Sequence, residues 1–237
     1  MKTRIWELDA LRGLALLGMI GIHLIYDLVD LFGILPWELP AWYLLFKNNY
    51  GAVFLLISGI SVTLGSHPVR RGLQVFLCGF LCTAATVGMY LAGAAGRDIV
   101  IYFGVLHCLG VCMMLWPLFR RGSNAALAIA AALMITLGLW LRTRGFSFPW
   151  LTILGFCPYG FASSDFFPLF PNLGYFLLGA ILGRRVYTGK RSLFPREDPP
   201  LPFLRWCGRK SLPIYLLHQP ILAAAVAGYA LLTGGML

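Results

Sequence analysis

The first long apolar stretch, residues 5–31, constrains the fold more than any other part of the chain. It is long enough to span a bilayer, and yet it carries six ionisable side chains. An ionisable group in hydrocarbon costs at least ~2.5 kcal/mol, so several on one span need a reason. At ~100° per residue, Arg12 and His23 differ by only ~20° in direction, and the three aspartates fall within about a right angle of that line. The polar side chains therefore form one stripe, which must face a protein interior or a wet cavity rather than lipid.

The composition of the whole chain agrees with a membrane protein. Its 237 residues are 59% hydrophobic and only 12% charged, with a mean hydropathy of +0.78. No soluble core needs so much apolar surface. We therefore predict an all-α fold, a polytopic transmembrane helix bundle forming a single domain over residues 1–237. About seven spans of bilayer length are expected, at 8–31, 45–65, 71–93, 99–118, 124–141, 167–184 and 211–233.

One further apolar stretch, residues 145–166, is broken by prolines and several glycines. It fits an outer loop or re-entrant segment better than a span. The proline-rich and charged stretch 184–210 indicates an exposed linker that could include a surface helix.

The basic residues alternate from loop to loop. Most of the 19 lie in the loops of one side, and this asymmetry accounts for much of the net charge of +10 without any nucleic-acid partner. By the positive-inside rule, we expect a multi-pass protein of the plasma (inner) membrane with a cytoplasmic N-terminus and an outer C-terminus. Arg12 and acidic residues interrupt the first apolar run, so the first span should be retained rather than cleaved as a signal peptide.

The polar stripe contains the parts of a general base. Asp9 and Arg12 are three residues apart near the cytoplasmic end of the first span, so they can pair. His23 lies ~16 Å further along the axis, past the middle of the bilayer. Asp27, one turn beyond, could accept the second N–H of the imidazole and fix its tautomer. The alternative is a histidine that only makes an interhelical hydrogen bond.

Five motifs, in this order, resemble one family of membrane enzymes. They are ELDALRG at 7–13, FLLISGISVTLG at 54–65, FGVLHCLG at 103–110, FPLFPNLGYFLLGAILG at 167–183 and SLPIYLLHQP at 211–220. They resemble the heparan-α-glucosaminide N-acetyltransferase catalytic-domain family, which is related to the acyltransferase-3 proteins. The resemblance implies a membrane enzyme that passes acetyl from cytosolic acetyl-CoA to an acceptor across the membrane. The first outer loop, about 32–44, lacks the histidine that the lysosomal members of the family place there, and this favours a sugar-type acceptor other than heparan.

On this interpretation the residues divide into three groups. His23 is expected to act as general base, oriented by Asp27, or to carry the acetyl group briefly. Arg12 with Asp9 is expected to face CoA, and three arginine pairs at the cytoplasmic ends of spans could bind its phosphates, although lipid headgroups could occupy each pair instead. The pairs are Arg70 and Arg71, Arg120 and Arg121, and Arg184 and Arg185. Candidate cavity or acceptor-binding groups are Asn48, Asn49, His107, Asn172 and His218.

Other functions remain open at this point. A transporter or permease would also hide polar stripes, but it should show repeated halves, and none is visible. A non-catalytic scaffold has little need of a buried Arg/His/Asp stripe. We expect the bilayer, acetyl-CoA and a carbohydrate-type acceptor as partners, no metal and no nucleic acid, and the sequence leaves room for a homodimer.

Overall fold

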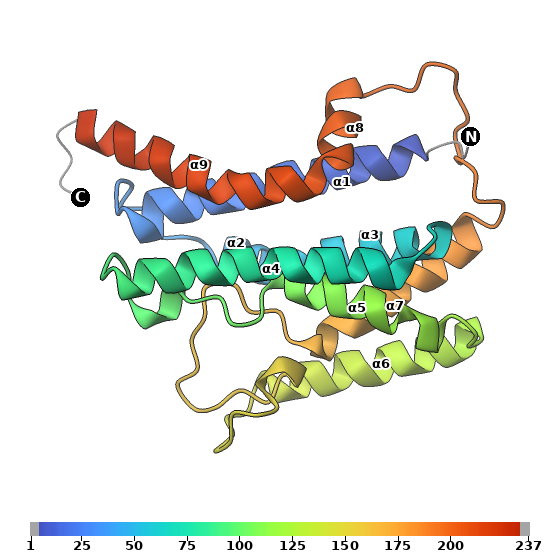
Figure 1. Ribbon diagram of the computed structural model, residues 1–237, viewed down its shortest axis with the longest axis horizontal. Coiled ribbons are helices and arrows are strands. Elements are labelled where there is room, and N and C mark those ends of the chain that lie inside the picture. The colour runs from blue at the N-terminus through green and yellow to red at the C-terminus, as the bar shows by residue number, and fades with distance from the viewer. Residues whose placement is uncertain (1–4, 233–237) are drawn as a thin grey trace. The chain divides into compact units, whose positions relative to one another are not determined.

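The computed structural model describes residues 5–232 and divides into two compact units. One unit is built from both ends of the chain, Met1–Val53 and Arg191–Leu237, and the other from Phe54–Lys190. Each is considered separately. The helices, labelled in Figure 1, are α1 (Trp6–Tyr26), α2 (Ala41–Asn49), α3 (Gly51–Leu64), α4 (Pro68–Leu91), α5 (Val105–Phe119), α6 (Asn124–Leu141), α7 (Leu169–Val186), α8 (Pro202–Arg209) and α9 (Ser211–Leu232).

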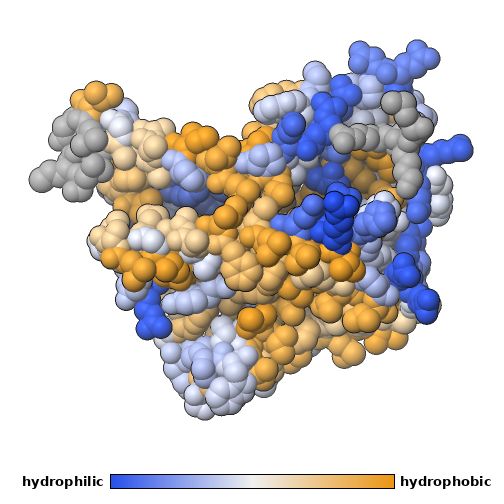
Figure 2. All heavy atoms as spheres, viewed as in Figure 1, coloured by the Kyte–Doolittle hydropathy of each residue, from blue (hydrophilic) through white to orange (hydrophobic). Residues whose placement is uncertain are grey.

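The helical membrane bundle predicted from the sequence is confirmed as a fold class. Within residues 5–232 the structure has no strand, only two isolated β-bridges. Five helical segments are long and apolar enough to cross a membrane: Trp6–Leu31, Ala41–Leu64, Pro68–Leu91, Asn124–Leu141 and Ser211–Tyr229. The fourth expected span corresponds to the shorter apolar helix α5, and α7 is not among the five. Figure 2 shows hydrophobic side chains along the sides of the helices, with hydrophilic ones gathered mainly over α8 and the helix ends.

Glycines at the helix contacts hold the unit Phe54–Lys190 together. Gly72 of α4 lies against Gly110 of α5, so these two helices approach closely and run antiparallel. Gly179 of α7 lies against Leu56 of α3 in the same way. Small residues are the usual means by which helices pack in a bilayer, where burial of apolar surface drives little association. The packing brings the end of α3, the start of α4, the end of α5, the start of α6 and the end of α7 to one end of the unit.

The segment 145–166 forms no α-helix. It contains a single 3₁₀ turn, Thr152–Leu154, and Phe146 pairs with Pro158 across the segment. Asp165 at its end accepts a hydrogen bond of 3.1 Å from the backbone N–H of Val105, at the first turn of α5. This irregular course agrees with the proline and glycine content that argued against a span.

In the other unit, α8 and α9 lie along α1. Gly13 of α1 lies against Leu204 of α8, and Gly208 of α8 against Asp9, so α8 runs antiparallel to the beginning of α1. The chain then reverses, and α9 runs parallel to α1. The segment before α8 is attached to the first turn of α1, because the Glu7 carboxylate accepts hydrogen bonds of 2.7 Å from both the Ser192 hydroxyl and the Leu193 N–H. The surface helix foreseen within 184–210 therefore exists, packed on the first span.

Helix α2 runs antiparallel to α1, and it gives Asn48 and Asn49 a different position in the second span from the one expected. Tyr43 donates a hydrogen bond to the Ile22 carbonyl, and Tyr50 donates one of 3.0 Å to the Ala15 carbonyl. The span therefore begins at Ala41 rather than 45, and Asn48 and Asn49 lie inside it rather than at its outer boundary. Their polarity, with that of Lys47, masked the start of the helix in the hydropathy pattern.

Candidate functional site

Two histidines from opposite ends of the chain meet between α1 and α9. The ring of His23 lies edge-on to that of His218, with centroids 4.8 Å apart and planes at 80°. Asp27 follows one turn after His23, where α1 widens into the π-helical turn Asp27–Leu31. Gln219 follows His218 in α9. We call these four residues, His23, Asp27, His218 and Gln219, the histidine cluster. Single π-helical turns are rare and occur often at functional sites.

In both imidazole rings a backbone carbonyl selects the same neutral tautomer. Nδ1 of His23 lies 3.0 Å from the Met19 carbonyl oxygen, and Nδ1 of His218 is hydrogen-bonded to the Tyr215 carbonyl. A carbonyl oxygen only accepts hydrogen bonds, so each Nδ1 must carry a proton. In each neutral ring the lone pair therefore sits on Nε2. That of His218 is buried and has no hydrogen-bond partner in the part of the chain that the structure describes.

Asp27 is fully buried, and its carboxylate is only half satisfied. Oδ1 accepts a hydrogen bond of 2.7 Å from the Gln219 side-chain amide, whereas Oδ2 has no partner among residues 5–232. The expectation that Asp27 would accept the second N–H of His23 is wrong, because the Met19 carbonyl takes that proton. A partner from α9 reaches the carboxylate, and a helical projection of α1 alone could not show it.

The expected pair of Asp9 and Arg12 is confirmed. The guanidinium Nη1 lies 3.0 Å from the Asp9 Oδ1, and the two side chains are 27% and 13% exposed for Arg12 and Asp9 respectively. The pair occupies the end of α1 on which α8 packs, ~16 Å along the axis from His23. It is therefore not in contact with the histidine cluster, and its role toward CoA stays a prediction.

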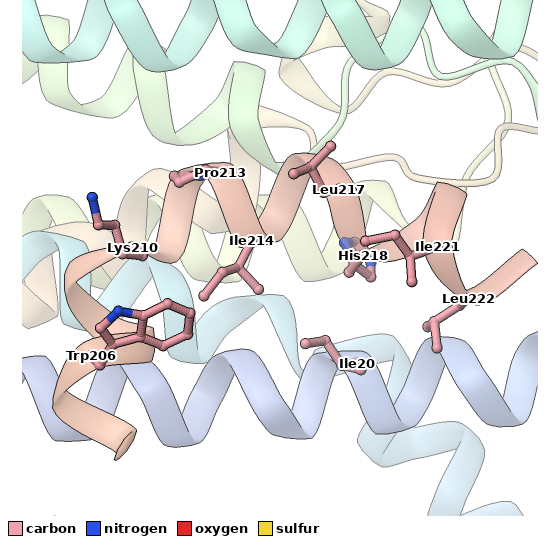
Figure 3. A pocket seen from close by; sticks show the side chains of 9 residues that line it. All are labelled: Ile20, Trp206, Lys210, Pro213, Ile214, Leu217, His218, Ile221 and Leu222. Carbon is pink, nitrogen blue, oxygen red and sulfur yellow. The ribbon is translucent and has the colours of Figure 1, made fainter. Parts of the chain in front are cut away.

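A groove of about 540 Å³ leads along α9 to His218 (Figure 3). Trp206 and Lys210 lie at one end, at the junction of α8 and α9, and Leu222 lies beyond the histidine. The surface that faces the groove is almost entirely apolar, although Lys210 and His218 are among the residues that line it. The complete lining is Ile20, Trp206, Lys210, Pro213, Ile214, Leu217, His218, Ile221 and Leu222.

The three arginine pairs share one end of the unit Phe54–Lys190, but they are not equivalent. Arg184 donates hydrogen bonds of 2.7 Å to the carbonyls of Gly122 and Arg120, and its guanidinium lies 5.1 Å from the Trp116 ring centroid. It thereby fixes the loop between α5 and α6, a structural role that competes with the expected contact to CoA. The other five arginines are exposed: Arg70, Arg71, Arg120, Arg121 and Arg185.

Three of the remaining candidates have structural partners of their own. His107, in the unit Phe54–Lys190, accepts the Gly104 N–H at Nδ1, and its ring is surrounded by Phe76, Phe80 and Phe103 at 5.1–5.6 Å. Asn172 is buried and donates to the Pro168 carbonyl at 2.8 Å. Asn49 donates to the Leu45 carbonyl of its own helix. These contacts favour the packing interpretation for each of them.

Sequence reasoning missed three groups in the unit built from both ends of the chain, Gln219, Trp206 and Lys210. Gln219 adjoins His218 in the last motif, and an amide beside a buried histidine was a usable signal. Trp206 and Lys210 are four residues apart at the end of an amphipathic segment, a spacing that places them on one helix face.

Comparison with known proteins adds one finding. Residues 4–220 match the family model described as "Heparan-alpha-glucosaminide N-acetyltransferase, catalytic". No curated protein and no solved structure matches the chain.

Proposed function

The chain belongs to the heparan-alpha-glucosaminide N-acetyltransferase catalytic family, and from this premise we propose that it passes acetyl from cytosolic acetyl-CoA to a sugar-type acceptor outside the inner membrane. Membership of the family implies an acetyltransferase. The identity of the acetyl donor, the identity of the acceptor and the direction of transfer are what we propose. The observation that carries it is the histidine cluster, in which two imidazole rings, each with Nδ1 at a backbone carbonyl, lie in contact beside a buried aspartate.

In this proposal His23 is the general base. Its Nδ1–H is held by the Met19 carbonyl, so Nε2 is the atom that takes the proton from the acceptor hydroxyl or amine. The buried Asp27 carboxyl group lies one turn away, where a negative charge would attract the imidazolium that forms during transfer. Its free Oδ2 also offers a hydrogen-bond acceptor to the incoming hydroxyl or amine.

His218 is the neighbour of the proposed base. The two rings are in contact. A proton taken up by Nε2 of His23 is passed on to the thiolate of CoA, while His218 beside it stays neutral. Two adjacent imidazoles cannot both be protonated at little cost, since like charges in a low-dielectric site repel strongly.

The exposed arginines at one end of the unit Phe54–Lys190 are the candidates for binding the phosphates of CoA. Arginine suits phosphate because its planar fork makes two parallel hydrogen bonds. The assignment of this end to the cytoplasm rests on the positive-inside rule. Arg184 is left out because its hydrogen bonds are already made within the fold.

The test is release of free CoA from acetyl-CoA by the purified full chain in lipid nanodiscs, with glucosamine and glucose as acceptor probes. We expect His23→Asn to lower the rate by roughly 10²–10⁴-fold, the usual contribution of a general base. His67→Asn is the matched control, because it removes an exposed imidazole from the loop before α4, and asparagine tolerates the positive φ of 59° there. Wild-type protein that releases no CoA with any acceptor, or with water, would refute the proposal and leave transport as the first alternative.

A further inference from the structure

The groove along α9 is about as long as one leaflet of a bilayer is deep. It extends from Lys210, directly before α9, to Leu222, and the chain rises by ~18 Å between them. Half of the hydrocarbon core of a bilayer is ~15 Å thick. The segment Ser211–Tyr229 is among those long and apolar enough to cross a membrane. The groove therefore covers about the depth that the acyl chains of one leaflet occupy.

The width of the groove limits what can lie in it. A volume of about 540 Å³ distributed over ~18 Å corresponds to a channel about 6 Å wide. An α-helix with its side chains is ~10–12 Å across, so a helix from a second copy of the chain is too wide. Carbon atoms in contact are ~4 Å apart, so a single alkyl chain fits.

The lining of the groove favours a hydrocarbon over any polar ligand. Almost all of its surface is apolar, and much of it comes from aliphatic side chains such as Ile214, Leu217 and Ile221. In Figure 3 the ammonium of Lys210 points away from the groove, and Ile20 of α1 points toward α9. Lys210 therefore contributes its methylene groups to the lining and leaves its charge outside.

Positive charge gathers where the groove begins. Arg205, Arg209 and Lys210 lie in or directly after α8, whereas residues 199–237 contain no aspartate or glutamate. The side chains of Arg209 and Lys210 are exposed. An anionic group at this end would therefore meet basic side chains without competition from acidic residues of the same segment.

Exposed aromatic rings mark the same end as the membrane interface. Phe203 and Trp206 of α8 are 62% and 49% exposed, and their rings are stacked with centroids 6.4 Å apart. Aromatic rings beside basic side chains are typical of the level at which lipid headgroups lie. By the positive-inside rule this is the cytoplasmic side, where the leaflet carries the anionic lipids.

We infer that one anionic phospholipid of the cytoplasmic leaflet binds to α8 and α9, with one acyl chain in the groove and its headgroup outside it. The phosphate stays at the level of the headgroups, beside the exposed side chains of Arg209 and Lys210. Only the acyl chain contacts the apolar lining, and it passes the ring of His218. The lipid thereby covers one side of the contact between α1 and α9. This inference does not depend on the proposed function.

The experiment is native mass spectrometry of the full chain in detergent, titrated with dioleoyl phosphatidylglycerol and, as a zwitterionic probe, dioleoyl phosphatidylcholine. We expect one tightly bound phosphatidylglycerol. Arg209→Gln with Lys210→Gln should lower its affinity by roughly 30-fold, since each basic residue near an anionic headgroup contributes about five-fold. Affinity for phosphatidylcholine should change little. Arg142→Gln with Arg144→Gln is the control, because it removes the same charge from exposed positions after α6.

A second variant tests the groove itself. Ile221→Trp places an indole in it and should lower the affinity for both lipids by roughly ten-fold or more, because each methylene excluded from the groove costs about four-fold. Ile129→Trp in α6 is the matched control, since Ile221 and Ile129 are 62% and 63% exposed and Ile129 does not line the groove. Thermal unfolding in the same detergent identifies any variant that fails to fold.

Three results would overturn the inference. The first is a wild-type protein that retains no phosphatidylglycerol. The second is equal affinity for the two lipids, which would exclude recognition of an anionic headgroup. The third is a folded Ile221→Trp variant that binds phosphatidylglycerol as tightly as the Ile129→Trp control, which would place the acyl chain elsewhere.

Discussion

At the residue scale, a substitution of the buried Asp27 can separate the effect of its charge from the effect of its hydrogen bond. Asp27→Asn keeps an oxygen that can accept the Gln219 amide, but it removes the negative charge. We expect folding to be kept, because losing a buried and incompletely paired charge is often neutral. Transfer should fall by about ten-fold or more, since the imidazolium loses its stabilising charge. Acyl transfer and thermal unfolding, measured on one preparation of the variant, would show whether transfer falls while stability is kept.

The partner of Asp27 should behave in the opposite way. Gln219→Leu leaves the Asp27 carboxylate buried without its hydrogen bond. An unsatisfied buried polar group costs about 1–3 kcal/mol, so this variant should unfold at a lower temperature than the wild type. Equal stability of Gln219→Leu and the wild type would mean that the amide is not the group that satisfies Asp27.

Arg12 and Asp9 allow a double-mutant test of their pairing. Because the side chains are 27% and 13% exposed, Arg12→Ala should cost about 1–2 kcal/mol of stability, between the values of surface and buried pairs. Arg12→Ala with Asp9→Ala should restore part of this. Arg12→Lys should keep much of the stability but bind acetyl-CoA worse if the guanidinium also grips phosphate. Normal affinity and activity in the double variant would remove both residues from the site.

The sequence predicted the contacts of single side chains correctly where the partner lay nearby in the same helix. Asp9 and Arg12 pair within one helix turn, and periodicity is enough to bring them together. The orientation of His23 also depends on its own helix, but the competing acceptor was a main-chain carbonyl, which no side-chain pattern displays. Asp27 meets a side chain nearly two hundred positions away, and helical periodicity says which face a residue takes but not which helix will face it.

At the element scale, the contact of α8 with α1 depends on two glycines. A Cβ on Gly208 would collide with the Asp9 carbonyl, and one on Gly13 with that of Leu204. Gly208→Ala should therefore force the helices apart and cost about 1–3 kcal/mol. Gly88→Ala in α4 is the control, because nothing lies within 4 Å of its added methyl. That variant should be neutral or more stable by up to about 1 kcal/mol, as measured by thermal unfolding in nanodiscs.

Hydropathy predicted where the helices lie in the sequence, but it was less accurate for their end residues and gave no information on which helices pack together. The expected spans recur as the helices α1, α3 to α7 and α9, although α5 and α7 are not among those long and apolar enough to cross a membrane, and the second span begins four residues earlier than its hydropathy indicated. The helix expected within 184–210 is present, and its packing on α1 could not be foreseen because a glycine in a charged linker indicates a turn as readily as a close contact.

At the scale of the whole molecule, the orientation in the membrane is open to direct measurement. In a cysteine-free background, His67→Cys should react with a membrane-impermeant thiol reagent only from the cytoplasmic side. Leu237→Cys, at a position outside the residues that the structure describes, should react only from outside. The excess of basic residues in alternate loops is the physical reason. Labelling of both positions from one side would indicate an even number of crossings and would return 145–166 to consideration as a span.

The two-part construction of the site has a consequence for biosynthesis. His23 emerges from the ribosome early, and His218 emerges only after the complete unit Phe54–Lys190 has been made. The nascent protein must therefore keep the half-buried stripe of α1 waiting in the translocon or the lipid until its partner arrives. Polar groups held in hydrocarbon without partners invite association with other chains or capture by quality-control proteases. Slow translation through the middle of the message should therefore reduce the yield of inserted protein far more than the same delay after α9.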